Sequence, residues 1–520
     1  MMLKIKQFLS SSQLLYLIGL CSIAIGLSLS KPLIGIGQLI IGFAWLLEGN
    51  YTNRIRAFFI NKLAWVLISF FVISLLGLLY TTNFSYGITD IKRKLPFFVL
   101  PFILFSVKLS SKELKLVFLV YLAGVLAATF WSIFVKLGGL GITIIDDRDL
   151  SRFNSHIRFG LEICIAIFGL AYYVFKEQNR KTKAILSITL LWLVAFLFIL
   201  NLFTGVLVLA ITSIVLMLFY GFKTSSVKTK LVLFLFPIVV VGLSGYFINK
   251  SITNFYHTST AILEEKKYSP YGEKYWHDLN NDDKENGNYV YRNIAKEELE
   301  YAWNKVSNIH YRGKDLKGQP IEATLIRFLT SKGEYKNQKA ILNLSTKEIK
   351  AIEQGISNCN YLTSNAFERR INSIIWEFDN YNRGRDYNGH SIVMRWVYWK
   401  TAWSIFKENI LFGVGTGDIQ DAFNKQYDKD NSILTEKFRL RAHNQFITAF
   451  VTYGFIGGIL FLVFLFYPFI ALNLKQHFLY LAFFLVMIIS MFTEDTLDTQ
   501  VGLTLFVFFN SLLIFNKEEL

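Results

Sequence analysis

The chain has 520 residues, of which 53% are hydrophobic and 16% aromatic, and its formal net charge is +16. Soluble domains contain about 45–50% apolar residues even when glycine is counted, so this composition excludes an ordinary soluble protein. A net positive charge can indicate a nucleic-acid-binding protein. Here the basic residues lie mostly in short loops between apolar stretches, and there is no DNA- or RNA-binding motif. The composition therefore predicts an all-α protein that crosses a membrane many times.

About twelve stretches come near the ~20 apolar residues that a helix needs to cross a bilayer. They lie approximately at 12–30, 33–49, 57–80, 95–107, 114–136, 156–175, 184–200, 202–221, 230–248, 447–472, 477–493 and 499–516. The fourth is short and contains Pro96 and Pro101, so it is expected to be kinked or only partly spanning. The seventh and eighth are separated only by a polar turn near Asn201.

The distribution of lysine and arginine in the short loops predicts the orientation, because cytoplasmic loops carry an excess of both. With the N-terminus inside, the inner loops are the basic ones and the last outer loop is acidic, with Glu494, Asp495 and Asp498. Both termini are then cytoplasmic. Lys4 and Lys6 precede an apolar stretch without a convincing cleavage site, which favours a retained first helix over a removed signal peptide.

This orientation divides the chain into three predicted parts. Residues 1–248 hold transmembrane helices 1–9, residues 249–442 form one large outer loop, and residues 443–520 hold helices 10–12. The outer loop is predicted to be mainly helical, because apolar residues recur at helical spacing in several stretches. These stretches lie near 293–307, 321–330, 346–358 and 364–379, whereas 265–292 is rich in Tyr, Asn and Asp and is expected to be irregular.

Two groups of basic residues fall on the outer side against the rule. Lys92, Arg93 and Lys94 precede the fourth span, and Arg148, Arg152 and Arg158 surround the entry to the sixth. A few outer basic residues are ordinary scatter. Alternatively, cations at the outer membrane surface bind an anionic lipid headgroup such as a pyrophosphate, with Arg93 and Arg158 as candidates.

A helix is predicted near 391–408, with Ser391 as its N-cap and with Arg395 and Trp399 one turn apart. It is rich in aromatic residues, which suits a helix at a membrane interface. It ends at Asn409, before a G-x-G-x-G pattern at 413–417. No strand precedes this pattern, so a dinucleotide site is disfavoured, and the glycines predict a tight turn with left-handed backbone.

The stretch 439–446 joins the long polar segment to an apolar helix. Arg439, Arg441, His443 and Asn444 lie close together in it. If the stretch is helical, Arg439 and His443 share a face. One interpretation is a basic collar that anchors a helix end in lipid headgroups, with His443 as a polar cap. The other is a phosphate-binding arginine beside a histidine base.

Several other kinds of site are disfavoured. Cys21, Cys164 and Cys359 have no near partners, so neither a disulfide framework nor a zinc spacing is present. The sequence has no P-loop, no H-E-x-x-H and no G-x-S-x-G motif. His277 and Asp278 near 281–283 lack a defined ligand spacing and are interpreted as a solvated acidic loop. No metal and no cofactor are therefore expected.

At this point the chain resembles the O-antigen ligase and polymerase family of bacterial envelope enzymes. The match is best over about 390–515. Three segments carry it. Arg395 to Trp403 and Glu408 to Gly417 are similar to the family's arginine-headed helix and glycine turn, although Ile410 stands where many relatives have proline. Ala442 to Phe446, with Tyr453, Gly454 and Gly457, are similar to its histidine-containing helix entry, and Thr493 to Gln500 are similar to its acidic turn before the last span.

The resemblance implies that a glycan is moved from undecaprenyl diphosphate to an acceptor hydroxyl at the periplasmic face of the bacterial inner membrane, without metal or nucleotide. His443 would be the general base, and Asn444 would orient the histidine or the sugar. Arg395, with Arg439 or Arg441 or both, would bind the diphosphate. The chemistry is suitable, because arginine binds phosphate in bidentate fashion and a positioned base accelerates such reactions by about 10²–10⁴-fold.

One feature departs from the family pattern. Members often carry an arginine in a turn between the seventh and eighth spans, thought to hold phosphate. The corresponding stretch 201–205 has none. Either another cation substitutes, with Arg158, Arg152 and Arg93 as candidates, or the donor is held differently.

Three functions stay open at this point. A ligase transfers the glycan to a lipid A core sugar, and a repeat-unit polymerase transfers it to another lipid-linked glycan. The sequence does not separate these two. A flippase or transporter of the same lipid is disfavoured, because the chain shows no internal repeat and few charges at the centres of its spans. The expected partners are the lipid-linked donor, the acceptor and membrane lipids.

Overall fold

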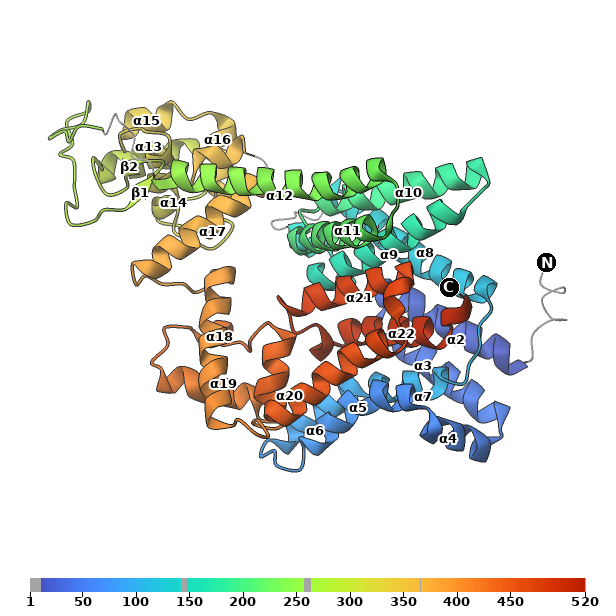
Figure 1. Cartoon of the computed structure of the whole chain (residues 1–520). Helices are drawn as coiled ribbons and strands as arrows, with labels where there is room; N and C mark the ends of the chain where they lie inside the picture. The colour runs from blue at the N-terminus through green and yellow to red at the C-terminus, as the bar shows by residue number, and fades with distance from the viewer. Residues whose placement is uncertain (1–10, 140, 142–146, 257–262, 365, 520) are drawn as a thin grey trace. The chain divides into compact units, whose positions relative to one another are not determined.

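A computed structural model describes residues 11–139, 141, 147–256, 263–364 and 366–519 (Figure 1). Lys4, Lys6 and the side chain of Arg148, which the sequence analysis considered, lie outside the described part. The chain folds into two compact units. We name residues 1–226 with 387–520 the bundle unit, and residues 227–386 the insert unit. Each is described by itself.

The bundle unit consists of helices. They are α2 (Ser11–Leu29), α3 (Lys31–Glu48), α4 (Tyr51–Ile60), α5 (Lys62–Leu76), α6 (Phe84–Lys94), α7 (Pro96–Leu104), α8 (Ser111–Lys136), α9 (His156–Lys176), α10 (Arg180–Ile199), α11 (Phe203–Lys223), α18 (Ser391–Glu408), α19 (Ile419–Lys429), α20 (Gln445–Ala471), α21 (Phe478–Met491) and α22 (Gln500–Phe515), with short 3-10 turns that include Glu436–Phe438 and Thr496–Asp498.

Within the described residues of the whole chain, eight helices are long and apolar enough to cross a membrane, or nine if the bent pair α4 and α5 forms one span. Every predicted stretch contains a helix, but the predicted number of twelve is not confirmed. The stretch 57–80 is bent by 84°, because Asn61 ends α4 and its side chain caps α5. The helix α7 has 9 residues and begins at Pro96, a residue favoured in the first helical turn. By length and composition, these helices indicate a multi-pass membrane protein.

The core of the bundle unit is apolar and aromatic. Helix α20 packs along α5, and α22 packs against α7 and α21 (Figure 1). Phe70 stacks on Phe464 with ring centroids 5.4 Å apart and meets Phe97 edge to face. The residues of α22 from Val501 to Phe515 are all buried. This packing fixes the two ends of the polar turn between α21 and α22.

The insert unit has one long apolar helix followed by small elements. They are α12 (Val227–Tyr256), β1 (Lys284–Glu285), β2 (Asn288–Tyr289), α13 (Lys296–Val306), α14 (Ile321–Ser331), α15 (Gln338–Leu342), α16 (Thr346–Glu353) and α17 (Ala366–Asn382), with a 3-10 turn at Cys359–Leu362. The four predicted amphipathic stretches are helices. The stretch 265–292 is mostly irregular, but β1 and β2 form an antiparallel hairpin. Asn286 and Gly287 both have positive φ there, as a two-residue hairpin turn requires.

The insert unit has a core of its own. Trp303 and Phe328 are fully buried and belong to the same apolar cluster, together with Leu329, Ile341 and Ile352. Helix α16 begins with a capping box between Ser345 and Glu348. The two-sided pattern of α13, α14 and α16 explains why the sequence predicted them, because one face of each contributes to this core.

Candidate functional site

The acidic turn between α21 and α22, residues 493–498, is the centre of the polar part of the bundle unit. Its carboxyl-bearing side chains are Glu494, Asp495 and Asp498, and all three are buried. Charged groups this deep need partners, because burying an unpaired charge is very costly. The partners come from α6, α9, α18 and the segment that precedes α20.

Three cationic or titratable side chains converge on Glu494. Arg395 of α18 donates from Nη2 to Oε1 at 2.8 Å, and His443 lies with Nδ1 3.3 Å from Oε2. Arg158 of α9 places Nη1 3.7 Å from the same Oε2. We name Glu494, Arg158, Arg395 and His443 the Glu494 cluster. Arg158 and Arg395, which the sequence indicated as candidate diphosphate-binding residues, therefore lie at the same carboxylate as His443, the candidate base.

The electrostatics of this cluster favour a charged carboxylate. Burial by itself would raise the pKa of Glu494, but His443, Arg158 and Arg395 together hold it below its ordinary value. The carboxylate is thus ionised at neutral pH and fixes the cations around it. Arg158 also keeps its buried Nε without a hydrogen-bond partner. A buried donor without a partner is costly, so this N–H is a candidate contact for a ligand.

His443 is held in a specific pose. Its backbone φ is +47°, a left-handed conformation that histidine adopts more readily than most residues but that still costs free energy. Its ring stacks on Tyr398 at 5.8 Å between centroids, and 31% of its side chain is exposed. If Nδ1–H donates to Glu494, the lone pair of the imidazole lies on Nε2. That is the arrangement that a general base requires.

Four backbone carbonyl groups that precede His443 accept side-chain hydrogen bonds, so the segment is rigid although it is not helical. Tyr398 and Trp399 of α18 and Gln420 and Tyr427 of α19 supply the donors, with lengths of 2.6–3.0 Å. The pairs are Tyr398 with Phe438, Gln420 with Arg439, Tyr427 with Leu440, and Trp399 with Ala442. The sequence condition that Arg439 and His443 share a helix face is therefore not met, because α20 begins only at Gln445.

Asn444 is the N-cap of α20. Its Oδ1 accepts from the backbone N–H groups of Phe446 and Ile447, each at 3.1 Å, and its Nδ2 donates to the carbonyl of Phe492 at 3.0 Å. The amide is thus engaged in holding the helix start next to the acidic turn. The predicted N-cap of α18 is also corrected, because His390 occupies that position and Ser391 is the first helical residue.

Arg439 contacts none of the three carboxyl groups of the turn. It pairs with Asp428 of α19 at 2.5 Å, and its Nε donates to the carbonyl of Leu434 at 3.0 Å. Asp428 is 70% exposed. Of the three arginines at 395, 439 and 441, Arg395 and Arg441 reach the acidic turn and Arg439 does not.

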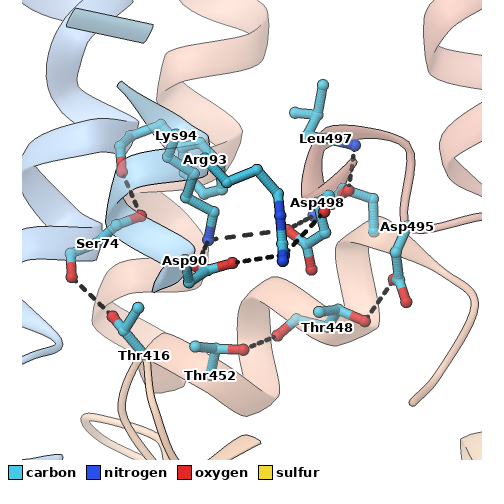
Figure 2. A network of polar contacts seen from close by, with 12 residues as sticks. Ser74, Asp90, Arg93, Lys94, Thr416, Thr448, Thr452, Asp495, Leu497 and Asp498 are labelled. Carbon is cyan, nitrogen blue, oxygen red and sulfur yellow. Dashed lines mark hydrogen bonds and ion pairs between the residues drawn. The ribbon is translucent and has the colours of Figure 1, made fainter. Parts of the chain in front are cut away.

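A second group of side chains surrounds Asp498, and we name it the Asp498 cluster. Figure 2 labels its members other than Arg441. The cluster contains Asp498, Asp90, Arg93, Lys94 and Arg441. Arg441 binds the carboxylate at 2.9 Å, and Lys94 lies 3.7 Å from it and 2.7 Å from Asp90. Arg93 donates from Nη1 to Asp90 and to the backbone carbonyl of Asp498. Helix α6 thus brings Arg93 and Lys94 of the predicted outer basic group to the same turn.

The carboxyl groups of the turn differ in their ionisation. Burial would raise the pKa of Asp498, but Lys94 and Arg441 hold it below its ordinary value. Burial raises the pKa of Asp495, which accepts a hydrogen bond from Thr448 at 2.6 Å. The turn therefore supplies one fixed anion to each cluster, and Asp495 has the weakest tendency to ionise of its three carboxyl groups.

The glycine pattern at 413–417 has a structural role in positioning the site. Helix α20 is broken at Gly454, which has φ +65°. The amides of Val414 and Gly415 donate to the freed carbonyls of Val451 and Thr452 at 3.1 and 2.9 Å. A Cβ on Gly413 would lie 2.4 Å from the amide nitrogen of Gly454, so this approach needs glycine. The predicted left-handed turn is confirmed.

Sequence reasoning missed part of this site. Glu494 and Asp498 were noticed only as an acidic turn, without a role, and Lys94 only as a member of a basic group. Tyr398 was not considered, although it lies one turn from Met394 on the same face of α18. The signal that could have found Lys94 is its spacing of four residues from Asp90, which predicts an ion pair on one helix face.

The fold and the site together define a class of protein. This is a multi-pass membrane protein in which arginines and a histidine share buried carboxylates at a loop between apolar helices. Such a site is suited to hold an anionic group beside a base.

Residues 355–462 match the family model described as O-antigen ligase, and this match supports the O-antigen ligase family for the chain. The matched segment contains Arg395, Arg441 and His443, whereas Glu494 and Arg158 lie outside it. No curated protein matches the chain.

Proposed function

We propose that the protein transfers a glycan from undecaprenyl diphosphate to an acceptor hydroxyl at the periplasmic face of the bacterial inner membrane. The observation that carries this proposal is the Glu494 cluster, in which a partly exposed histidine and two arginines share one carboxylate. The family match supports ligase- or polymerase-type glycosyl transfer in general. The lipid carrier, the membrane side and the roles of single residues are our own assignments.

The proposed reaction needs a base and a cationic site for the leaving group. Nε2 of His443 takes the proton from the acceptor hydroxyl while the acceptor oxygen forms a bond to the anomeric carbon. The bond from that carbon to the diphosphate oxygen breaks, and the diphosphate leaves with the electron pair. Fixed cations stabilise the charge that develops on it. We assign this role to Arg158, Arg395 and Arg441.

Glu494 is a positioning residue in this scheme. Its carboxylate orients the imidazole through Nδ1 and stabilises the imidazolium that forms when the proton is taken, as buried carboxylates do in other histidine-dependent enzymes. Asn444 positions the same segment through the helix cap. No step requires a metal or a nucleotide.

The arginines of the site support the binding of a diphosphate, but they favour neither acceptor. A lipid A core sugar would make the protein a ligase, and a second lipid-linked glycan would make it a polymerase. Nothing in the Glu494 cluster distinguishes the two, because both acceptors present a sugar hydroxyl. The acceptor must therefore be determined from the products.

The test is a deletion strain complemented with wild type, His443→Ala or His477→Ala, with surface glycolipids resolved on gels and by mass. Loss of a base is expected to reduce transfer by about 10²–10⁴-fold, so His443→Ala should fail and His477→Ala, a matched histidine at the start of α21, should restore the ladder. Long glycan stranded on the carrier indicates a ligase, and cores with a single repeat indicate a polymerase. Full restoration by His443→Ala contradicts the proposed mechanism.

A transporter would give a different result in a purified system. The wild-type protein is expected to convert lipid-linked glycan to product in detergent, where no gradient exists. Product formation there excludes a transport function as the cause of the cellular phenotype. Failure of the purified protein to form product, under conditions where it is folded, contradicts the transferase proposal.

A further inference from the structure

The insert unit contains a cavity that the proposed reaction does not use. It has a volume of about 290 Å³ and lies between the β1–β2 hairpin, α14 and α17. We name it the insert pocket. Its volume is close to the lower end of the ~300–1,000 Å³ typical of small-molecule sites, so it is large enough for a single small ring system with its substituents.

Two aromatic side chains line this pocket. Tyr291 follows β2, and Trp376 lies on α17. The guanidinium carbon of Arg327 lies 4.8 Å from the centroid of the Trp376 ring. This cation–π contact holds the indole in place. A fixed aromatic ring offers an apolar surface against which the C–H face of a sugar ring can pack.

The polar groups of the pocket are oriented by one another. Arg327 donates from Nε to Glu285 at 2.7 Å, and Asn358 donates to the other oxygen of Glu285 at 2.9 Å. Arg385 pairs with Asp283 and donates to the side chain of Asn380 at 3.2 Å. The wall therefore holds both fixed donors and fixed acceptors, which suits hydroxyl groups, because each hydroxyl both donates and accepts.

The charges argue against other ligands. Four carboxylate residues line the pocket against three basic residues, so an anion such as a phosphate is disfavoured. The carboxylates face arginines, and among the described residues no group of three or more His, Cys, Asp or Glu side chains could hold a metal ion. A neutral polyhydroxyl ligand needs no additional charge in the site.

We infer that the insert pocket is a saccharide-binding site that takes a sugar unit of the glycan used in the proposed reaction. The inference rests on the proposed function for the source of the sugar. That source is either the donor glycan or the acceptor. Both present the same ring and hydroxyl chemistry, so the experiment must separate them.

The test measures binding of lipid-free glycans to the full-length protein in detergent by saturation-transfer difference NMR. One arm uses the oligosaccharide released by mild acid from the strain's lipid-linked donor, and the other uses its core oligosaccharide. One of the two is expected to bind. Trp376→Leu and Asp379→Asn, which changes a carboxylate that lines the pocket, are each expected to raise Kd by about tenfold. The first removes the ring face against which the sugar packs, and the second weakens a hydrogen bond from a sugar hydroxyl to a charged group.

The matched control is Phe378→Leu, an aromatic residue on the same helix that is 40% exposed and does not line the pocket. It should leave Kd unchanged. Thermal unfolding of each variant separates a lost site from a lost fold, and the isosteric Asp379→Asn keeps the test valid if Trp376→Leu unfolds. His443→Ala should bind the glycan like wild type. Absence of binding in both arms, or equal Kd values for Trp376→Leu and Phe378→Leu, overturns the inference.

These results also separate the two proposals. If His443→Ala retains both glycan binding and glycan transfer, the proposed mechanism is contradicted and the saccharide site is still supported. Loss of transfer in His443→Ala with no glycan binding to wild type contradicts the saccharide site alone.

Discussion

The Glu494 and Asp498 clusters lie on one short turn and use the same kinds of residues, but they are built differently. In the Glu494 cluster the His443 and Arg395 side chains are 31% and 25% exposed, and two of the three contacts to the carboxylate are 3.3 and 3.7 Å long. In the Asp498 cluster Lys94 is 4% exposed and binds Asp90 at 2.7 Å, and Arg441 is 18% exposed, whereas Arg93 at the edge of the cluster is 32% exposed. Looser and more open contacts can exchange for a ligand, whereas the buried ones hold helices together.

This difference teaches that charge alone does not identify a reactive group. Both clusters contain arginine and a carboxylate with a lowered pKa. Only the Glu494 cluster adds a partly exposed histidine and a buried arginine N–H without a partner. We therefore assign chemistry to the first and structure mainly to the second, with Arg441 at 18% exposure between them.

The largest effect that would test this comparison is on stability. Asp498→Asn removes the shared partner of Lys94 and Arg441, and breaking a buried ion pair on one side costs roughly 3–5 kcal/mol. We expect a clear loss of thermal stability in detergent. Asp428→Asn is the matched control, because this aspartate is 70% exposed and such pairs contribute only about 0–1 kcal/mol. Equal unfolding temperatures for the two variants would show that the Asp498 cluster does not hold the fold.

The next effect is on the rate. Glu494→Gln keeps the shape of the side chain but removes the charge that faces His443. Hydrogen bonds to charged groups contribute roughly 1.5–3 kcal/mol, so kcat should fall by about ten- to hundredfold while KM for the acceptor changes little. The exposed Glu436 lies on the segment before His443, and Glu436→Gln is the control. A change confined to KM argues that Glu494 contacts the substrate instead of positioning the base.

A smaller effect concerns pH. The lowered pKa of Glu494 contributes stability that is present above the ordinary value of about 4.3 and is lost as pH falls through the folded-state pKa. In the double variant Arg158→Gln, Arg395→Gln, His443 still lowers this pKa but the two arginines no longer do, so the pKa of Glu494 lies higher than in wild type. The variant should therefore lose most stability relative to wild type near pH 7, and the difference in Tm should shrink toward pH 4. A difference that is constant over this range contradicts the assigned cause.

The smallest expected effect is that of Arg439→Ala. Arg439 pairs with an exposed aspartate and reaches neither cluster, so transfer should stay within about twofold of wild type, as for an exposed ion pair of 0–1 kcal/mol. Arg395→Ala, at the Glu494 cluster, should reduce transfer strongly in the same assay. If Arg439→Ala is as defective as Arg395→Ala, the diphosphate binds near Arg439, and the assignment of the diphosphate-binding arginines must be changed.

Much of the architecture was accessible from the sequence, because apolar length and helical periodicity are local properties. Helix 391–408 and the amphipathic helices of the insert unit follow from such patterns. The number of spans was not, because the bend at Asn61 depends on a side-chain cap inside an apolar stretch. The short α7, in contrast, was expected from Pro96 and Pro101.

The site was accessible only in part. His443 and Arg395 were found, since they belong to motifs, and the importance of Arg158 was considered because it broke a charge rule. Their meeting at Glu494 could not be predicted, because it joins positions up to 336 residues apart in the chain through the packing of α9, α18 and α21. The separation of Arg439 from Arg441 depends on a non-helical loop whose hydrogen-bond partners lie on α18 and α19.

The contact between the glycine turn and the break in α20 has a consequence for how such proteins are recognised. Glycine is required at positions 413 and 454 because the backbones of the two segments approach closely there. This requirement does not depend on whether a histidine is present at position 443. A descendant could lose His443 and still keep both glycines, because its fold would need them. Such a chain would still match over this segment while being an inactive homologue. On the mechanism that we propose, the residues at positions 443 and 494 would therefore indicate activity in a relative, and the glycines would indicate only its fold.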